Sequence, residues 1–162
     1  MTYHAPPTAR IGHVHLKVAN LERAIAFYSG VLGFGISARY GTQAAFLAAG
    51  DYHHHIGLNT WESAGATAPP PGHTGLYHTA FLFPDRAALA TTVKRVLAAG
   101  IQLDGKADHL VSEAVYLRDP DQNGVELYWD RPKSEWPYDA TGTLQMGNKP
   151  LDLNALLAEA AS

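Results

Sequence analysis

The sequence predicts an α+β protein made of two βαβββ units that follow one another along the chain. The stretch from Ile11, IGHVHLKVANLERAIAFYSGVLGFGI, has the same pattern as the stretch from Leu76, LYHTAFLFPDRAALATTVKRVLAAGI. Each stretch opens with a short apolar strand, continues into apolar residues at helical spacing, and is followed by extended segments. The repeat therefore predicts two copies of one supersecondary unit.

The helix of each unit has recognisable ends. Asn20 and Asp85 stand where the pattern changes from strand to helix, and both residue types favour the N-cap position. Gly33 and Gly100 follow the last residues at helical spacing, as glycine commonly does at the end of a helix. These signals predict one helix between residues 20 and 33 and another between residues 85 and 100.

Extended patterns complete each unit. The predicted strands span 34–39, 44–48 and 54–60 in the first unit, and 102–103, 114–117 and 125–129 in the second. The units therefore cover about 10–61 and 75–130, and the proline-rich stretch 62–74 links them. We expect one domain over residues 1–132, followed by a tail, 133–162, with a short helix near 151–160.

Composition excludes several classes of function. The chain has 162 residues and a formal charge of −3, so it has no basic footprint for nucleic acid. It contains no cysteine, which excludes disulfides and thiolate metal sites. No segment approaches the roughly 20 apolar residues of a membrane span, and no signal peptide is evident. We expect a cytoplasmic protein with no membrane partner.

Two histidines and one glutamate form a candidate metal site. His13 and His78 each occupy the third position of the aligned opening strands. If the units pack about a pseudo-twofold axis, both can reach one point. Glu126 follows an Asp- and Gly-rich turn and lies in an apolar strand, where an unpaired carboxylate is costly. Two unrelated strand histidines and a water-facing glutamate remain the alternative.

Together these motifs resemble the vicinal oxygen chelate superfamily, which includes glyoxalases, fosfomycin-resistance proteins and extradiol dioxygenases. The resemblance covers residues 10 to about 132. It rests on the G-H of the first strand, AFYSGVLGF in the first helix, the strand histidine of the second unit, and DPDQNGVEL near its end. It implies paired βαβββ modules forming a cup-shaped half-barrel around a divalent metal held by His13, His78 and Glu126.

Within the superfamily, the sequence looks most like single-domain relatives of catechol 2,3-dioxygenase. Glyoxalases add a carboxylate ligand at the position that aligns with Gly57, which has no side chain. Two histidines and one carboxylate leave positions open, as in non-haem Fe(II) oxygenases. The resemblance therefore implies extradiol cleavage of a catechol-like diol by O2 at Fe(II), with Mn(II) as the alternative metal.

The resemblance also implies three catalytic residues beyond the ligands. His54 is the candidate acid–base group, although strand alternation favours His53 or His55. Tyr116 is expected to hydrogen-bond the substrate oxygen, and His109 to support it. The remaining histidines have other expected roles: His15 is a less favoured ligand, and His4 and His73 are surface residues.

Two other functions remain open. One is a different metal enzyme of the superfamily, such as a glyoxalase, an epimerase or a fosfomycin-type transferase. The other is a non-enzymatic small-molecule binding module, which the intact ligand triad disfavours. Whatever the function, we expect a homodimer or a higher homo-oligomer, in which the tail helix could take part.

Overall fold

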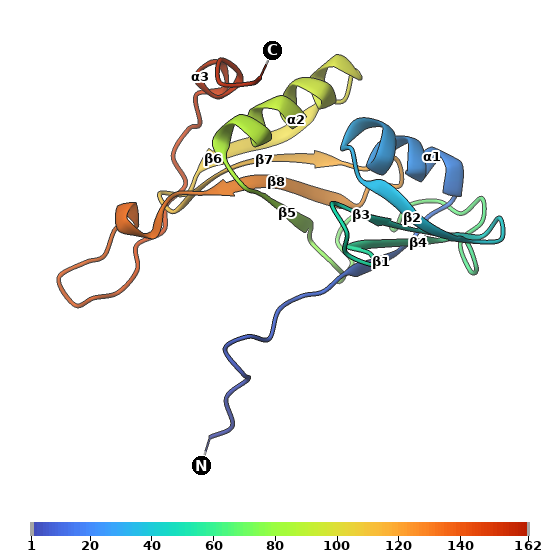
Figure 1. Cartoon of the computed structure of the whole chain (residues 1–162), viewed down its shortest axis with the longest axis horizontal. Helices are drawn as coiled ribbons and strands as arrows, with labels where there is room; N and C mark the ends of the chain where they lie inside the picture. The colour runs from blue at the N-terminus through green and yellow to red at the C-terminus, as the bar shows by residue number, and fades with distance from the viewer. Residues whose placement is uncertain (1, 162) are drawn as a thin grey trace.

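The computed structural model describes residues 2–161 and contains two four-stranded mixed sheets with helices on one side (Figure 1). This confirms the predicted α+β class, and the arrangement is open, not a closed barrel. Among the described residues, no helix is long and apolar enough to cross a membrane.

The first unit forms a sheet with the strand order β1-β4-β3-β2. Its strands are β1 (Val14–Lys17), β2 (Gly35–Tyr40), β3 (Ala44–Ala48) and β4 (Ile56–Asn59). Strands β1 and β4 are parallel, and the other neighbours are antiparallel. The last strand begins at Ile56 and not at residue 54, because residues 51–55 form turns and bends.

The helix of the first unit changes its geometry midway. α1 (Leu21–Ile25) is capped by the Asn20 side chain, which accepts a hydrogen bond from the Arg23 backbone N–H at 2.9 Å. It continues as a π-helix, η1 (Ala26–Val31), and the chain turns at Gly33 with a φ of 89°. The predicted cap and terminal glycine are present, but the sequence pattern did not indicate the π-helical turn.

The second unit repeats the topology with the order β5-β8-β7-β6. Its elements are β5 (Thr79–Phe83), α2 (Arg86–Ala98), β6 (Leu103–Asp108), β7 (Ser112–Arg118) and β8 (Gly124–Asp130). Asp85 caps α2 as predicted, accepting a hydrogen bond from the Ala88 backbone N–H at 2.8 Å. Strand β6 is longer than predicted, because its alternating polar residues obscure it in the sequence.

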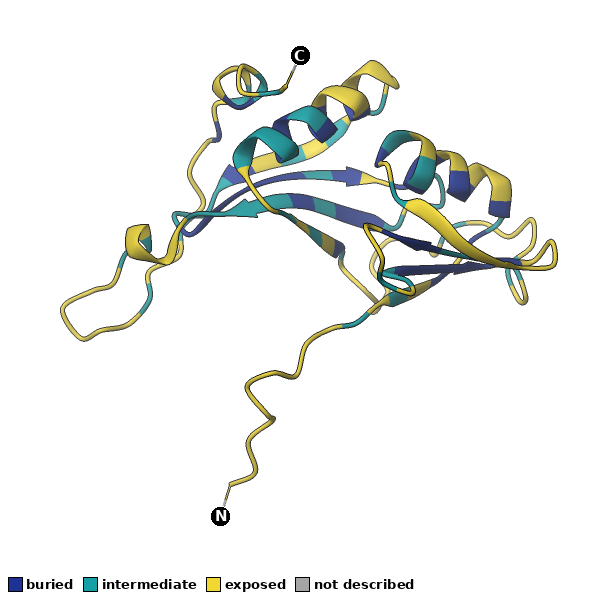
Figure 2. Cartoon of the chain, in the orientation of Figure 1, coloured by how far each residue is buried: buried dark blue, intermediate teal, exposed yellow. Residues whose placement is uncertain are grey.

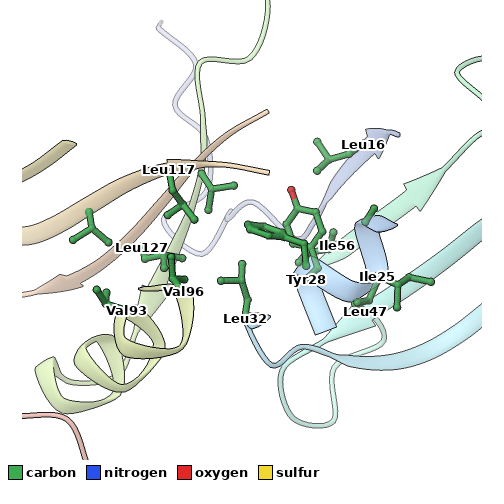
Figure 3. Close-up of a cluster of buried hydrophobic side chains, with 14 of the residues drawn as sticks. Leu16, Ile25, Tyr28, Leu32, Leu47, Ile56, Val93, Val96, Leu117 and Leu127 are labelled. Atoms are coloured by element: carbon green, nitrogen blue, oxygen red, sulfur yellow. The ribbon is translucent and has the colours of Figure 1, made fainter. Parts of the chain in front are cut away.

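One hydrophobic cluster lies between the sheets and their helices and spans both units (Figures 2 and 3). Tyr28, Leu47 and Ile56 from the first unit share it with Val93 and Leu127 from the second. Burying large apolar side chains in one shared cluster joins the units, since each fully buried side chain contributes about 1.5–3 kcal/mol. The other side of each sheet is not covered by these helices, and we call it the open face.

A short tail returns to the helix layer. It contains η2 (Lys133–Glu135) and α3 (Leu153–Leu157), which is shorter than the predicted helix. Leu151 and Leu156 are buried in the shared cluster, so the tail is part of the fold (Figure 1).

Candidate metal and catalytic site

His78 and Glu126 are adjacent on the open face of the second unit. The His78 Nε2 atom lies 2.9 Å from Glu126 Oε2. The pairing of Ala80 with Glu126 in the parallel β5–β8 ladder brings the start of β5 beside the start of β8. The Glu126 side chain is only 13% exposed, so the carboxylate depends on the partners around it.

Gly124 makes this approach possible. A Cβ atom at Gly124 would lie 2.1 Å from the Tyr77 carbonyl oxygen and 3.1 Å from the Cα of His78. No side chain fits there without moving the backbone that carries His78. The glycine of the DPDQNG turn is therefore required by close packing beside the candidate ligands.

Tyr116 and His109 extend the polar chain from Glu126. The Tyr116 hydroxyl donates to Glu126 Oε1 at 3.0 Å, and His109 Nε2 lies 2.6 Å from the same hydroxyl. Burial, followed by the charge and the hydrogen bond of Glu126, raises the pKa of Tyr116 far above its usual range. Tyr116 is therefore a neutral hydrogen-bond donor at physiological pH.

The candidate residues of the first unit form a separate cluster. The rings of His13 and His54 have centroids 4.4 Å apart, and Nδ1 of His54 lies 2.8 Å from Nδ1 of His53. Burial lowers the pKa of His54, and the charges of His13 and His53 lower it further. A histidine held mainly neutral near pH 7 can accept a proton.

The structure also shows why strand alternation misleads around His54. Residues 51–55 precede β4, so the alternation that begins at Ile56 does not extend back to them. The His54 ring lies against His13 and Phe46, whereas His55 accepts a hydrogen bond from the Ala49 backbone N–H. His54, and not His55, lies beside the candidate ligand His13.

His15 occupies the space above Gly57. A Cβ at Gly57 would lie 2.8 Å from the His15 ring, and that ring also contacts Phe46 and Trp61. Burial and the nearby His13 lower the pKa of His15. A side chain at position 57 and the observed place of the His15 ring exclude one another.

The second-unit pair fits a divalent metal by its chemistry and spacing. Two ligands bound at right angles about 2.1 Å from one ion are about 3 Å apart, close to the observed His78–Glu126 distance. His78 Nδ1 is buried without a hydrogen-bond partner, which is unusual for a purely structural histidine.

The third predicted ligand lies apart from that pair. Over residues 2–161, the structure contains no group of three His, Asp or Glu side chains close enough to hold a metal ion. His13 contacts His54 instead. The set His13, His78 and Glu126 therefore remains a prediction.

Sequence reasoning missed several residues that build the site. Asp119 is 1% exposed and accepts a hydrogen bond from the Tyr28 hydroxyl, so the DPDQNG turn also joins the two units. Gly147 accepts a hydrogen bond from His109 Nδ1 at 2.8 Å, although it lies in the tail. The clustering of Asp, Asn and Gly was a signal for the turn, but nothing in the sequence pattern pointed to Gly147.

Comparison with known proteins agrees with this architecture. A family model described as Glyoxalase/Bleomycin resistance protein/Dioxygenase superfamily matches residues 10–127. The chain is 41% identical to the catechol-2,3-dioxygenase of Bacillus subtilis (strain 168) over 151 residues, covering 93% of this chain and 52% of that protein. It is 33% identical to biphenyl-2,3-diol 1,2-dioxygenase 3 of Rhodococcus globerulus over 124 residues, covering 76% and 64%. The chain thus spans about half to two-thirds of the length of these relatives.

Solved structures share the fold. A glyoxalase/dioxygenase from Nostoc punctiforme aligns with a TM-score of 0.64 at 20% identity, covering 82% of this chain and 99% of that one. A lactoylglutathione lyase from Agrobacterium tumefaciens aligns with a TM-score of 0.57 at 28% identity, covering 77% and 96%. The match of the family model to most of the chain, together with the repeated βαβββ topology, shows that this protein belongs to the glyoxalase/bleomycin resistance protein/dioxygenase superfamily.

Proposed function

We propose that the protein is an extradiol-type ring-cleaving dioxygenase that acts on a catechol-like aromatic diol with O2. The observation that carries the proposal is the connected chain from His78 through Glu126 and Tyr116 to His109 on the open face. The similarity to two diol dioxygenases supports it.

The proposed metal is Fe(II), with Mn(II) as the alternative, held by His13, His78 and Glu126. A bound ferrous ion would supply the redox coupling between an electron-rich diol and O2. Two imidazole nitrogens and one carboxylate suit such an ion and leave positions open for substrate. Bringing His13 to the second-unit pair requires the two clusters of the open face to approach each other.

The protein's own residues have distinct proposed tasks. Tyr116 stays protonated and exchanges its hydrogen bond to Glu126 for one to a diol oxygen. His109 Nε2 lies against the Tyr116 hydroxyl and orients it. His54 accepts a proton from the diol and later returns it to a developing oxygen anion, a role worth on the order of 10²–10⁴ in rate.

The decisive test is anaerobic reconstitution with Fe(II), followed by oxygen uptake on a panel of catechols. We expect one O2 consumed for each diol and a ring-opened product. A metal-loaded protein that binds catechols but consumes no oxygen would contradict the proposal. Purified protein with no affinity for divalent metal would favour the non-enzymatic binding module instead.

Three single variants test the acid–base assignment. His54→Phe should retain its iron and bind catechol, while turnover falls on the order of 10²–10⁴. His53→Phe and His55→Phe serve as matched controls, because each replaces one imidazole of the same run. A metal-replete, inactive His55→Phe beside an active His54→Phe would show that His55, and not His54, is the acid–base residue.

A second candidate is another metal-dependent reaction of the superfamily. The 28% identity to a lactoylglutathione lyase favours testing it. Gly57 disfavours it, since the His15 ring fills the space that a ligand side chain would need. Glutathione-adduct isomerisation by the metal-loaded protein, without oxygen uptake on any diol, would establish this alternative.

A further inference from the structure

The C-terminal segment (residues 145–161) pairs with the tip of the β6–β7 hairpin, which carries His109. Asp108 and Lys149 exchange two backbone hydrogen bonds of 2.9 Å, and the Gly147 N–H donates to the His109 carbonyl at 3.0 Å. The His109 ring adds a fourth contact through Nδ1 and the Gly147 carbonyl, at 2.8 Å. Both the backbone and the ring of His109 are therefore held by the tail.

The segment is anchored well away from this contact. Leu156 of α3 is fully buried, and Leu151 is 5% exposed. The Asp152 side chain caps α3, and the Ala161 N–H donates to Thr91 Oγ1 of α2 at 3.2 Å. An apolar anchor on the helix layer thus fixes the course of the chain across the hairpin (Figure 1).

The contact surface allows little change at Gly147. A Cβ atom there would lie 3.0 Å from Cγ and Cδ1 of Leu110. Leu110 itself has a φ of 72°, in the left-handed region that non-glycine residues rarely adopt. Its N–H donates to Asp108 Oδ1 at 2.8 Å, which helps to hold that conformation. The strained residue is located next to the histidine that the tail holds.

The hydrogen-bonding partners determine the protonated nitrogen of His109. A carbonyl oxygen only accepts, so the His109 Nδ1 atom that faces Gly147 must carry a proton. In the neutral ring, Nε2 is then an acceptor, 2.6 Å from the Tyr116 hydroxyl, whose single proton it shares with Glu126 Oε1 at 3.0 Å. Without Gly147, either nitrogen could carry the proton and the ring could rotate.

We propose that the C-terminal segment is a positioning element, in which the Gly147 carbonyl fixes the Nδ1–H form of His109 and directs Nε2 to Tyr116. Gly147 is a positioning residue, because it acts through His109. The effect on turnover rests on the proposed dioxygenase function. The tautomer does not, since it follows from the contacts of this chain alone.

The first experiment is NMR of the full-length chain with ¹⁵N-labelled histidine, without added metal and at a pH where His109 is neutral. We expect His109 to carry its proton on Nδ1, with slow exchange of that proton and of the Gly147 and Lys149 amides. A neutral His109 protonated on Nε2 would overturn the proposal without any variant.

The second experiment compares variants of the tail. In Gly147→Ala, the added methyl group meets Leu110, so the carbonyl shifts and His109 should become a mixture of tautomers. Leu110→Ala in the same chain removes the obstructing atoms and should restore the Nδ1–H form. Asn148→Ala is the matched control, because Asn148 is an exposed neighbour, and it should leave His109 unchanged.

Kinetics of the iron-loaded variants provide the functional readout. Gly147→Ala should lower kcat on the order of 10- to 100-fold with little change in KM and a shifted pH profile, and the double variant should recover. Oxygen uptake that is unaffected in Gly147→Ala would refute the positioning role and leave the proposed function intact. An altered tautomer in a protein without oxygen uptake on any diol would refute the proposed function and leave the tautomer assignment intact.

Discussion

The two units have the same framework and different open faces. The parallel registers pair Val14 with Ile56 in the first unit and Thr79 with Val125 in the second, which makes the flanking positions equivalent. In the antiparallel registers, Phe46 lies opposite Gly57 and Tyr116 lies opposite Glu126. The equivalent pairs are His13 and His78, His15 and Ala80, Phe46 and Tyr116, and Gly57 and Glu126.

In two of these pairs, the large and the small residue change places between the units. In the first unit, the large ring of His15 lies over Gly57, which has no side chain. In the second unit, the small Ala80 lies beside Glu126, whose carboxylate reaches His78. Each ladder has space for only one large group at this point, and the two units use it in opposite ways.

Phe46 and Tyr116 differ by one hydroxyl group. The Tyr116 hydroxyl joins Glu126 to His109, whereas Phe46 only packs against the rings of His15 and His54. The second unit therefore has a connected chain of polar side chains, whereas the first has a cluster of histidine rings packed against Phe46. A duplicated framework can thus carry two different sets of polar side chains on the open faces of its two units.

Removing the second-unit carboxylate should have the largest effect. Glu126→Ala should lower metal content by more than about tenfold and abolish turnover, because loss of even an outer-shell partner costs about 10- to 100-fold in metal affinity. Elemental analysis after Fe(II) loading and desalting measures this. Glu22→Ala removes an exposed carboxylate paired with Arg39 and should bind metal normally. Full metal occupancy in Glu126→Ala would remove Glu126 from the ligand set.

Building a carboxylate into the first unit should test the size exchange. Gly57→Glu should lower the free energy of unfolding by about 3 kcal/mol, because the new Cβ overlaps the His15 ring and overpacking costs this much. His15→Ala in the same chain copies the Ala80–Glu126 arrangement and should recover most of the loss. Urea unfolding measures both variants. Equal stabilities for the single and double variants would show that His15 is not the obstacle.

Removing the Tyr28–Asp119 hydrogen bond, which links the two units, should have a smaller effect on stability. Tyr28→Phe removes the buried hydrogen bond to Asp119, and we expect a loss of about 2 kcal/mol, within the range for bonds to charged groups. Asp119 keeps its bonds from the N–H groups of Asp121 and Asn123, which limits the effect. Tyr40→Phe, at an exposed tyrosine, is the control. A Tyr28→Phe protein as stable as the control would mean that this bond does not join the units.

Features encoded locally could be predicted from the sequence. The N-caps at Asn20 and Asp85 and the matched positions of His13 and His78 follow from short patterns, and the registers agree with them. Features that depend on distant contacts could not be predicted. The orientation of His54 depends on where β4 begins, and the bond of His109 to Gly147 depends on where the tail docks.

The smallest predicted effect is a pH dependence that originates at His15. Burial and the charge of His13 lower the pKa of His15 below its usual value of 6.5 in the folded state, so the unfolded chain binds this proton more readily. The free energy of unfolding should therefore fall as the pH drops below about 6.5, and it should level off below the folded-state pKa. Because the ring is largely exposed, solvent screening limits the contribution to about a few tenths of a kcal/mol. His15→Phe keeps a ring above Gly57 and removes the titration, so the difference between its stability and that of the wild-type protein should shift in favour of the variant from pH 8 to pH 5. Urea titrations across that range measure the shift, and a difference independent of pH would show that His15 binds a proton equally well in the folded and unfolded chains.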